Sequence, residues 1–537
     1  MRTIIILFFL IVSSTYSQSD VWWIFFQDKD CSQSIALSQR SIDRRIQKNI
    51  PLDWYDFPVC QEYIDNIKNH DLLIRHQSRW LNAVSVSVES LSLLEPILDY
   101  SFVKEIRPAY KIINDGYEIN QQNNIDFSNY QMRNSLLSYG SSFNQIDMLG
   151  GVELHNQGFL GEGMTIAVFD AGFIGLETLP IFENLWDNNQ ILHTYDFVDN
   201  NPDVFNGSFH GTMVLSTMGG YMLDSLIGTA PAANYMLFRT EDSASETLIE
   251  EDNWAAAAEY ADSVGVDIIN SSLGYTVLYD DTLNSHLYSD MDGNSTIITN
   301  AADLAASRGI LVINSAGNSG NNDWYYIGAP ADGDSVLAVG AVNSFGQVSS
   351  FSSRGPSYDG RIKPNICAQG SMSVVADQDS TIRLASGTSF SSPIVAGLAA
   401  CLWQALSTQI MNINNMHIFD IIQESAHLFL NPNDSLGYGI PNFYSAYLNN
   451  LHTPVFFNDI KIYPNPYIHS LSLENNSEAD VCVEIFNIIG DLIFSQFIID
   501  AKSKINISEL ANLKAGVYFL KICNEQIIYP IVKMNGN

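Results

Sequence analysis

Asp170 is the first residue with a setting that suggests chemistry. It ends the apolar stretch 166–170 and is followed by a turn that contains glycine. A carboxylate at the end of a strand is partly buried, where it can orient a neighbouring imidazole. An aspartate that merely caps a turn has the same local pattern, so this segment alone fits either interpretation.

His210 opens a second segment, 209–220, in which a Gly-Thr pair leads into an apolar, helix-like run. A helix N-terminus carries partial positive charge, so we expect it to lower the pKa of the imidazole and favour a neutral base. The alternative is a histidine that caps the helix or packs in the core. That alternative fits most of the other nine histidines of the chain.

Ser389 lies in a third segment, 386–404, among small residues that leave its hydroxyl accessible. Pro393 follows, and proline is tolerated close to the start of a helix. The N-terminus of such a helix favours negative charge that develops near it. A serine-rich helix cap would look similar in isolation.

Taken in order, these three segments resemble the signature blocks of the subtilisin-like serine proteases, the subtilases. The order Asp, His, Ser along the chain is the one found in that family, and the resemblance spans about residues 145–445. It implies that Ser389 attacks the scissile carbonyl and that His210 takes and returns the proton. It also implies that Asp170 holds the imidazole in place.

Two further segments resemble the same family. Residues 315–318 resemble its oxyanion segment, which implies that Asn318 donates its side-chain amide to the oxyanion. Residues 271–275 resemble the strand that pairs with an extended substrate peptide. The residues implied to line that strand are Ser272, Leu273 and Gly274.

The surrounding pattern predicts the fold that positions these residues. Short apolar strands alternate with helices, which is typical of a parallel sheet with helices on both faces. The predicted strands are 164–170, 233–240, 266–274, 310–318 and 335–342, and two of the predicted helices are 246–265 and 296–309. In such α/β folds the active groups lie in loops at the carboxyl ends of the strands. We therefore expect a subtilisin-like fold.

Residues 1–17 have the pattern of a secretory signal peptide: a basic start at Arg2, the apolar run 4–12 and then small residues. A membrane anchor is the alternative, but this run is about half of the ~20 residues that a transmembrane helix needs. We also expect no other stretch to be long and apolar enough to cross a bilayer.

Residues 18–140 predict a small α+β unit followed by a polar linker at 114–131, which could be cut. Their position and pattern resemble the inhibitory N-terminal propeptide of secreted subtilases, which implies a zymogen with an intramolecular inhibitor. A separate binding domain is the alternative. The predicted strands are 22–27 and 81–90, and the predicted helices are 38–49 and 59–70.

Residues 451–537 show short β-rich runs with turn signals, which predict a small β-sandwich. The segments 462–466 and 513–522 resemble the C-terminal sorting domains of the Bacteroidetes type IX secretion system. That resemblance implies export machinery as a partner. A generic sandwich that binds carbohydrate or protein is the alternative.

The six cysteines fall two to each unit: Cys31 and Cys60, Cys367 and Cys401, Cys482 and Cys523. In an exported chain this spacing would suit one disulfide per unit. Buried free thiols are the alternative, and Cys401 in particular lies in an apolar, helix-like run.

The net charge of −34 disfavours nucleic-acid binding, since an acidic surface repels phosphate. Residues 141–450 carry 6 basic and 34 acidic side chains and so account for −28 of that charge. The chemistry itself needs no cofactor. Structural calcium, common in subtilases, has possible oxygen ligands in 196–203 and 289–295, although a solvated polar loop is the favoured interpretation of both segments.

Together these features predict a monomeric serine endopeptidase that hydrolyses polypeptides, is made as a zymogen and is secreted or held at the cell surface. A catalytically inactive, subtilase-like binding or adhesion protein is the alternative. The predicted division is signal peptide 1–17, propeptide and linker 18–140, catalytic domain 141–450 and sorting domain 451–537.

Overall fold

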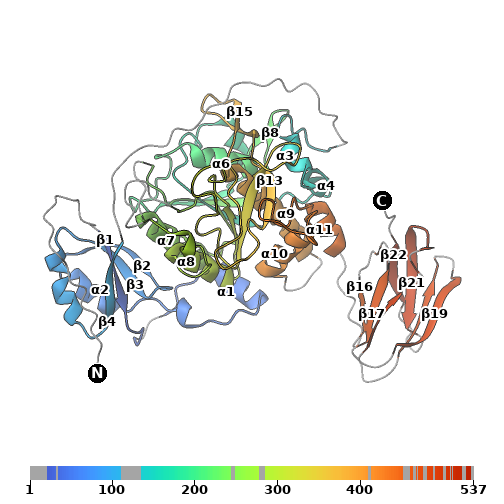
Figure 1. The fold of residues 1–537 in the computed structure, drawn as a ribbon, viewed down its shortest axis with the longest axis horizontal. Coiled ribbons are helices and arrows are strands. Elements are labelled where there is room, and N and C mark those ends of the chain that lie inside the picture. Colours follow the sequence, from blue (N-terminus) through green and yellow to red (C-terminus); the bar gives the residue numbers. More distant parts are fainter. Residues whose placement is uncertain are drawn as a thin grey trace.

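The computed structural model describes residues 21–31, 34–109, 135–243, 248–276, 285–408 and 413–450, and most of the strand residues between 460 and 533. The proposed signal peptide and the proposed linker at 114–131 lie outside the described residues. Three folded parts follow one another along the chain (Figure 1).

The central part is built on a parallel sheet, which confirms the predicted fold class. Its strand order within the described residues is β13-β12-β11-β10-β5-β9-β6. The strands are near-continuous apolar runs because both faces of the sheet are covered. Their bounds are β5 (Thr165–Asp170), β6 (Ile191–Asp196), β9 (Asn234–Arg239), β10 (Ile268–Ser271), β11 (Leu311–Ser315), β12 (Val336–Val342) and β13 (Ile366–Gln369).

Helices cover the sheet on both sides (Figure 1). On one face α7 (Ile249–Val264) packs beside α8 (Ile297–Ser307), and both contribute alanines to a core shared with the strands. On the other face α6 (His210–Gly219) packs against α9 (Thr388–Ser407) in a second, larger core. The two helices that begin at candidate site residues, α6 and α9, therefore lie in the same layer, on one face of the sheet.

Shorter elements complete the central part. The helices are α3 (Phe143–Asp147), α4 (Gly151–Asn156), α5 (Glu183–Asp187), α10 (Asn415–Glu424) and α11 (Phe443–Asn450). The strands are β7 (Tyr221–Met222), β8 (Leu226–Ile227), β14 (Ser373–Ala376) and β15 (Ile382–Ala385).

Helix α9 corrects one expectation from the sequence. It is 20 residues long and apolar enough to cross a membrane by length and composition, although no stretch beyond the signal peptide was expected to be so. Most of that helix is buried inside the protein. Its apolar residues fill the core because α9 touches five of the parallel strands.

The N-terminal part is a four-stranded antiparallel sheet of order β2-β3-β1-β4. The predicted strands and the second helix are confirmed to within a few residues. Its elements are β1 (Val21–Phe26), α2 (Gln61–Lys68), β2 (Leu73–Ser78), β3 (Ala83–Ser87) and β4 (Val103–Ala109). One face packs on α2 around Ile24, Ile64 and Val84. The other face meets Ile249 and Ile297, at the starts of α7 and α8.

Helix α1 (Gln39–Gln47) forms where the sequence predicts a helix, but it does not belong to the core of the N-terminal unit. It packs against α7 of the central part instead. The physical reason lies in its two buried arginines, Arg44 and Arg45, whose partner is Asp262 of α7.

The C-terminal part consists of two antiparallel sheets that share one apolar core, as expected for a small β-sandwich. One sheet has the order β16-β17-β20 and the other β19-β18-β21-β22. The bounds are β16 (Ile460–Tyr463), β17 (Leu471–Asn475), β18 (Val481–Phe486), β19 (Leu492–Ile499), β20 (Ser503–Ile507), β21 (Gly516–Ile522) and β22 (Ile528–Lys533).

The cysteines do not follow the pattern of one bridge per unit. Cys31 and Cys60 form a disulfide, and Cys482 is also disulfide-bonded. In the central part Cys367 and Cys401 are free and buried on separate elements, which contradicts the paired expectation there. The thiol of Cys401 instead donates to a backbone carbonyl in the core.

Candidate active site

Three of the expected site residues lie at the carboxyl ends of adjacent parallel strands. Asp170 ends β5, Ser272 follows the neighbouring β10, and Asn318 lies three residues beyond β11. His210 and Ser389 lie in the helical layer formed by α6 and α9: His210 is the first residue of α6 and Ser389 is the second of α9. This is the edge at which α/β folds place their functional loops.

Asp170 and His210 form a direct pair. The Asp170 carboxylate is fully buried, and its Oδ1 lies 2.8 Å from His210 Nδ1. The backbone N–H of Ala171 donates to the same oxygen, also at 2.8 Å. The imidazole keeps 24% of its side chain exposed, so the pair has one buried end and one accessible end.

The pKa of His210 is raised above its ordinary value. Burial acts to lower that pKa, but the charge and hydrogen bond of Asp170 outweigh it, and Glu241 adds a smaller effect. The expectation of a lowered pKa is therefore wrong, because a full carboxylate charge at contact exceeds the partial charge of a helix end. Sequence reasoning also missed Glu241, which accepts a hydrogen bond from Tyr275.

Ser389 lies close to the substrate-strand segment. Its hydroxyl oxygen is 3.4 Å from the carbonyl oxygen of Ser272, and the Ser272 hydroxyl donates to the Ser389 carbonyl at 2.9 Å. Phe390 follows Ser389 on α9, and the centroid of its ring lies 6.0 Å from the centroid of the His210 ring. The start of α9 is thus held beside the start of α6.

A buried polar chain lies beneath this serine. The Ser392 hydroxyl donates to Asn270 Oδ1 at 2.9 Å, and Asn270 Nδ2 donates to the Ser272 hydroxyl at 3.3 Å. Satisfied buried networks of this kind fix side chains in one arrangement. Sequence reasoning missed Asn270, although an asparagine inside an otherwise apolar strand was an available signal.

Asn318 is exposed, and its amide is oriented by Thr388. Asn318 Oδ1 accepts hydrogen bonds from the Thr388 backbone N–H at 2.9 Å and from its hydroxyl at 3.0 Å. With its oxygen occupied, the amide presents Nδ2 as a donor. A Cβ at Gly387 would lie 3.6 Å from that nitrogen, so the glycine keeps the space beside the donor open.

The segment expected to bind an extended peptide runs from buried to exposed. Ser272 is buried, Leu273 is half-buried and Gly274 is exposed. Tyr275 then pairs with Ala329, with two backbone hydrogen bonds of 2.9 and 3.1 Å. One side of this segment is thereby fixed by the protein itself.

The two acidic loops considered for calcium use their carboxylates internally. Asp292 accepts hydrogen bonds at 2.8 Å from the backbone N–H groups of Asn294 and Ser295. Asp196 accepts two from backbone N–H groups, at 2.8 and 3.0 Å, and pairs with Arg239 at 2.7 Å. Among the described residues, no group of three or more His, Cys, Asp or Glu side chains could hold a metal ion.

Residues 161–439 match the family model described as "Subtilase family". The chain belongs to the subtilase family. In this subtilase the N-terminal residues 21–126 match a peptidase S8 propeptide domain of Bacteroidota, and residues 461–533 match a secretion system C-terminal sorting domain.

Curated relatives resemble the central part. The thermophilic serine proteinase of Bacillus sp. (strain AK1) is 30% identical over 287 residues, which are 53% of this chain and 61% of that protein. Subtilisin E of Bacillus subtilis (strain 168) is 30% identical over 261 residues, or 48% and 60% of the two chains. The subtilase thus spans about three fifths of the length of these relatives.

Solved structures share the fold. Fervidolysin from Fervidobacterium pennivorans, described as a keratinolytic enzyme related to subtilisin, matches with a TM-score of 0.56 at 18% identity. That match covers 96% of this subtilase and 72% of fervidolysin. The epidermin leader peptide processing serine protease from Staphylococcus aureus matches with a TM-score of 0.53 at 16% identity, covering 80% and 99% of the two chains.

Proposed function

We propose that this subtilase is a serine endopeptidase with Ser389 as nucleophile, His210 as general base and Asp170 as the residue that orients the imidazole. The observation that carries the proposal is the 2.8 Å contact between buried Asp170 and part-exposed His210, at the edge of the sheet where α9 presents Ser389. Membership of the subtilase family supports the same assignment.

The steps follow from these roles. His210 Nε2 takes the proton of Ser389 as its oxygen attacks the scissile carbonyl, and the resulting imidazolium is stabilised by Asp170. Asn318 Nδ2 and the backbone N–H of Ser389 donate to the oxyanion. His210 then protonates the leaving amine, and water hydrolyses the acyl-enzyme by the same route in reverse.

The proposed substrates are polypeptides bound in extended form. Ser272, Leu273 and Gly274 would supply backbone groups to the substrate, in the manner of an added strand. The half-buried side chain of Leu273 and the exposed Gly274 support this role because they leave backbone accessible beside Ser389. Nucleic acid is not a proposed ligand, since the net charge is −34.

The two flanking parts support a secreted zymogen. The match of residues 21–126 to a propeptide domain supports an intramolecular inhibitor, and the match of residues 461–533 to a sorting domain supports delivery to the cell surface or beyond by export machinery. We propose a monomer. If structural calcium is present, its ligands would differ from the internally bonded Asp196 and Asp292.

A fluorophosphonate probe tests the proposal on the secreted protein. We expect covalent labelling of the parent chain and none of Ser389→Ala, because the probe reacts only with an activated serine. Ser391→Ala, two residues further along α9, is the matched control and should keep its labelling. Peptide-library digestion and mass spectrometry of the same samples would report specificity and the processed ends. A folded parent protein that stays unlabelled would support the inactive binding protein instead.

A further inference from the structure

The segment 34–60 of the N-terminal unit lies against the central part away from the candidate active site. We call this segment the arm. A disulfide closes it into a loop by linking Cys60, at one end of the arm, to Cys31, just before the other end, 29 positions earlier. The arm contains α1 and a short 3₁₀ helix (Trp54–Asp56), and it crosses the ends of α7 and α8 (Figure 1).

The arm caps the C-terminal end of α7. The Ser38 backbone N–H donates to the Ser263 carbonyl at 2.8 Å, and Arg40 Nε donates to the Gly265 carbonyl at 2.8 Å. Arg44 donates to the Asp262 carbonyl at 3.2 Å. Terminal helix carbonyls lack partners within the helix and carry partial negative charge, so cationic donors from the arm satisfy and stabilise them.

The arm also donates a hydrogen bond to a carbonyl just after the C-terminal end of α8. Lys48 Nζ donates to the Gly309 carbonyl at 2.9 Å and lies 4.1 Å from the centroid of the Trp403 ring. The fit is close at both glycines that follow these helices. A Cβ at Gly309 would lie 2.9 Å from Ile50 Cδ1, and one at Gly265 would lie 2.8 Å from the Ser41 backbone nitrogen.

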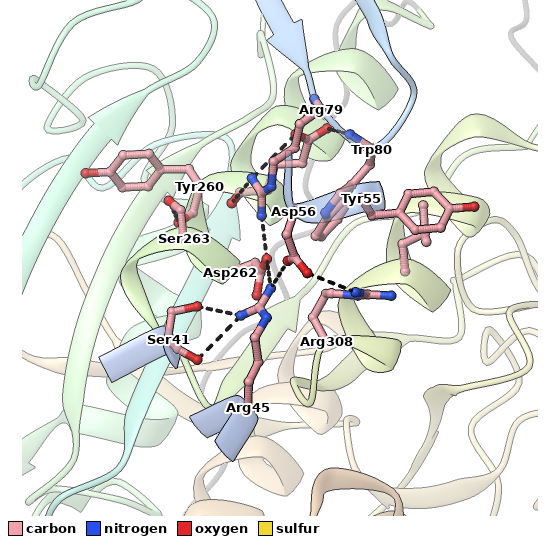
Figure 2. Close-up of polar contacts among 12 residues, drawn as sticks. Ser41, Arg45, Tyr55, Asp56, Arg79, Trp80, Tyr260, Asp262, Ser263 and Arg308 are labelled. Atoms are coloured by element: carbon pink, nitrogen blue, oxygen red, sulfur yellow. Dashed lines mark hydrogen bonds and ion pairs between the residues drawn. The ribbon is translucent and has the colours of Figure 1, made fainter. Parts of the chain in front are cut away.

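A buried ion cluster sits at the centre of this interface (Figure 2). Asp262 of α7 pairs with Arg44, with Arg45 at 2.8 Å and with Arg79. Arg45 also pairs at 2.7 Å with Asp56 of the arm. The side chains of Asp262, Arg44 and Arg45 are each at most 3% exposed. Loss of one partner would leave buried charge uncompensated.

The arm is also fastened to its own unit at the base. Lys29 Nζ donates to the carbonyls of Trp54 at 2.9 Å, Phe57 at 2.7 Å and Arg79 at 2.6 Å. Arg79 and Trp80 belong to the N-terminal unit proper, and Trp80 is buried in the core of the central part. The N-terminal unit therefore contacts the central part twice: through the closed loop of the arm and through the apolar contact of Trp80.

We propose that the arm is a disulfide-closed clamp, an exosite contact that holds the N-terminal unit on the catalytic domain independently of the active site. Two linked contacts bind more tightly than either alone, because the second forms within the complex. The disulfide limits the conformations of the free loop and so lowers the entropy lost when it docks. The clamp would keep a cleaved propeptide bound.

Charge complementarity favours this partner. The arm carries four basic and three acidic side chains, whereas residues 141–450 have a net charge of −28. Four basic residues of the arm, Arg40, Arg44, Arg45 and Lys48, face helix ends or carboxylates of the central part. Opposite charge across an interface raises the association rate and fixes the register.

Amide hydrogen exchange on the full chain tests docking without requiring activity. In a Ser389→Ala background, we compare the parent, Cys31→Ser/Cys60→Ser and Arg44→Ala, with Lys68→Ala as an exposed basic control in the same unit. In Cys31→Ser/Cys60→Ser and in Arg44→Ala, we expect exchange at residues 258–266 and 304–311 to be at least about tenfold faster than in the parent. Exchange in Lys68→Ala should equal that of the parent. Unchanged exchange in the disulfide variant would overturn the proposal.

A thiol reductant added to the folded parent avoids any defect in folding. Reduction should speed exchange at the same two helix ends and have no further effect on Cys31→Ser/Cys60→Ser, which retains the disulfide of Cys482. An equal response of both proteins would contradict a role for the Cys31–Cys60 bridge.

The effect on activity rests on the proposed peptidase function and is measured separately. In the catalytically competent full chain, reduction should release the cleaved N-terminal unit about tenfold faster and shorten the lag before peptide hydrolysis. Mass spectrometry should show that less of the cleaved N-terminal unit stays bound as the lag shortens. If loss of the disulfide speeds exchange in the Ser389→Ala chain but the catalytically competent chain shows no peptidase activity, the clamp is supported and the peptidase function is rejected.

Discussion

Two buried aspartates of the central part show how the same side chain serves different ends. Asp170 is fully buried and pairs with one imidazole, and its Oδ2 has no hydrogen-bond partner among the described residues. Asp262 is also fully buried but faces three guanidinium groups, from Arg44, Arg45 and Arg79. One carboxylate is left partly unsatisfied and the other is surrounded by positive charge.

The difference lies in whether the partner can release a proton. Arginine stays protonated in proteins, so an Asp262 cluster can only hold two surfaces together. Burial acts to raise the pKa of Asp262, but its arginine partners outweigh burial and lower that pKa. Histidine titrates near neutral pH, so the Asp170 pair can shuttle a proton. A buried aspartate that holds two surfaces together thus needs a partner that stays charged, whereas one that supports proton transfer needs a partner that titrates.

The largest expected effect comes from neutralising the first aspartate. Asp170→Asn should lower kcat/KM for a peptide substrate by about 10⁴-fold, because the imidazole loses its orienting charge. Asp170 and asparagine have nearly the same shape, so circular dichroism should stay unchanged. A drop below about tenfold would remove Asp170 from the proposed machinery.

Neutralising the second aspartate should affect stability and spare chemistry. In a Ser389→Ala full chain, Asp262→Asn should lower the free energy of unfolding by about 3–5 kcal/mol, because three arginines lose their shared buried charge. Urea denaturation measures the change. Glu105→Gln, which breaks an exposed pair with Arg107 on β4, is the control and should cost under about 1 kcal/mol. Equal losses in both variants would contradict the special place of Asp262.

Removal of the oxyanion donor should separate chemistry from binding. Asn318→Ala should lower kcat by about 10²–10³-fold, the loss typical of one oxyanion-hole donor, with little change in KM. The donor contributes mainly once negative charge has formed on the substrate. Asn321→Ala changes a nearby exposed asparagine and should leave both constants unchanged. A rise in KM alone would assign Asn318 to substrate binding.

The sequence predicted the fold, and the position of Asp170 at the end of a strand, for local reasons. The strand that ends at Asp170 is a short, apolar run, and periodicity identifies such runs directly. The order of the segments around Asp170, His210 and Ser389 carries a family resemblance, and residues 161–439 match that family. The roles of these three residues remain predictions that the experiments above test.

The second aspartate could not be found in this way. Arg45 and Asp262 are 217 positions apart, and an amphipathic pattern tells which face of a helix is polar but not what that face meets. Helix α1 was therefore predicted only as part of the N-terminal unit, with nothing to indicate that it packs on α7. Contacts between distant segments, such as the hydrogen bonds from Thr388 to Asn318, are likewise set by tertiary packing and leave little trace in the local pattern.

The smallest expected effect concerns pH and separates the two aspartates once more. Asp170 raises the pKa of His210 above its ordinary value of 6.5 against the opposing effect of burial. Because the base must be neutral, kcat/KM should rise with pH through a midpoint above that value. The residual activity of Asp170→Asn should rise at a lower pH, since burial would then be opposed only by the smaller effect of Glu241. Asp262→Asn, whose partners are arginines, should keep the midpoint of the parent. Profiles between about pH 5 and pH 9 with one common midpoint would contradict the assignment of this pKa shift to Asp170.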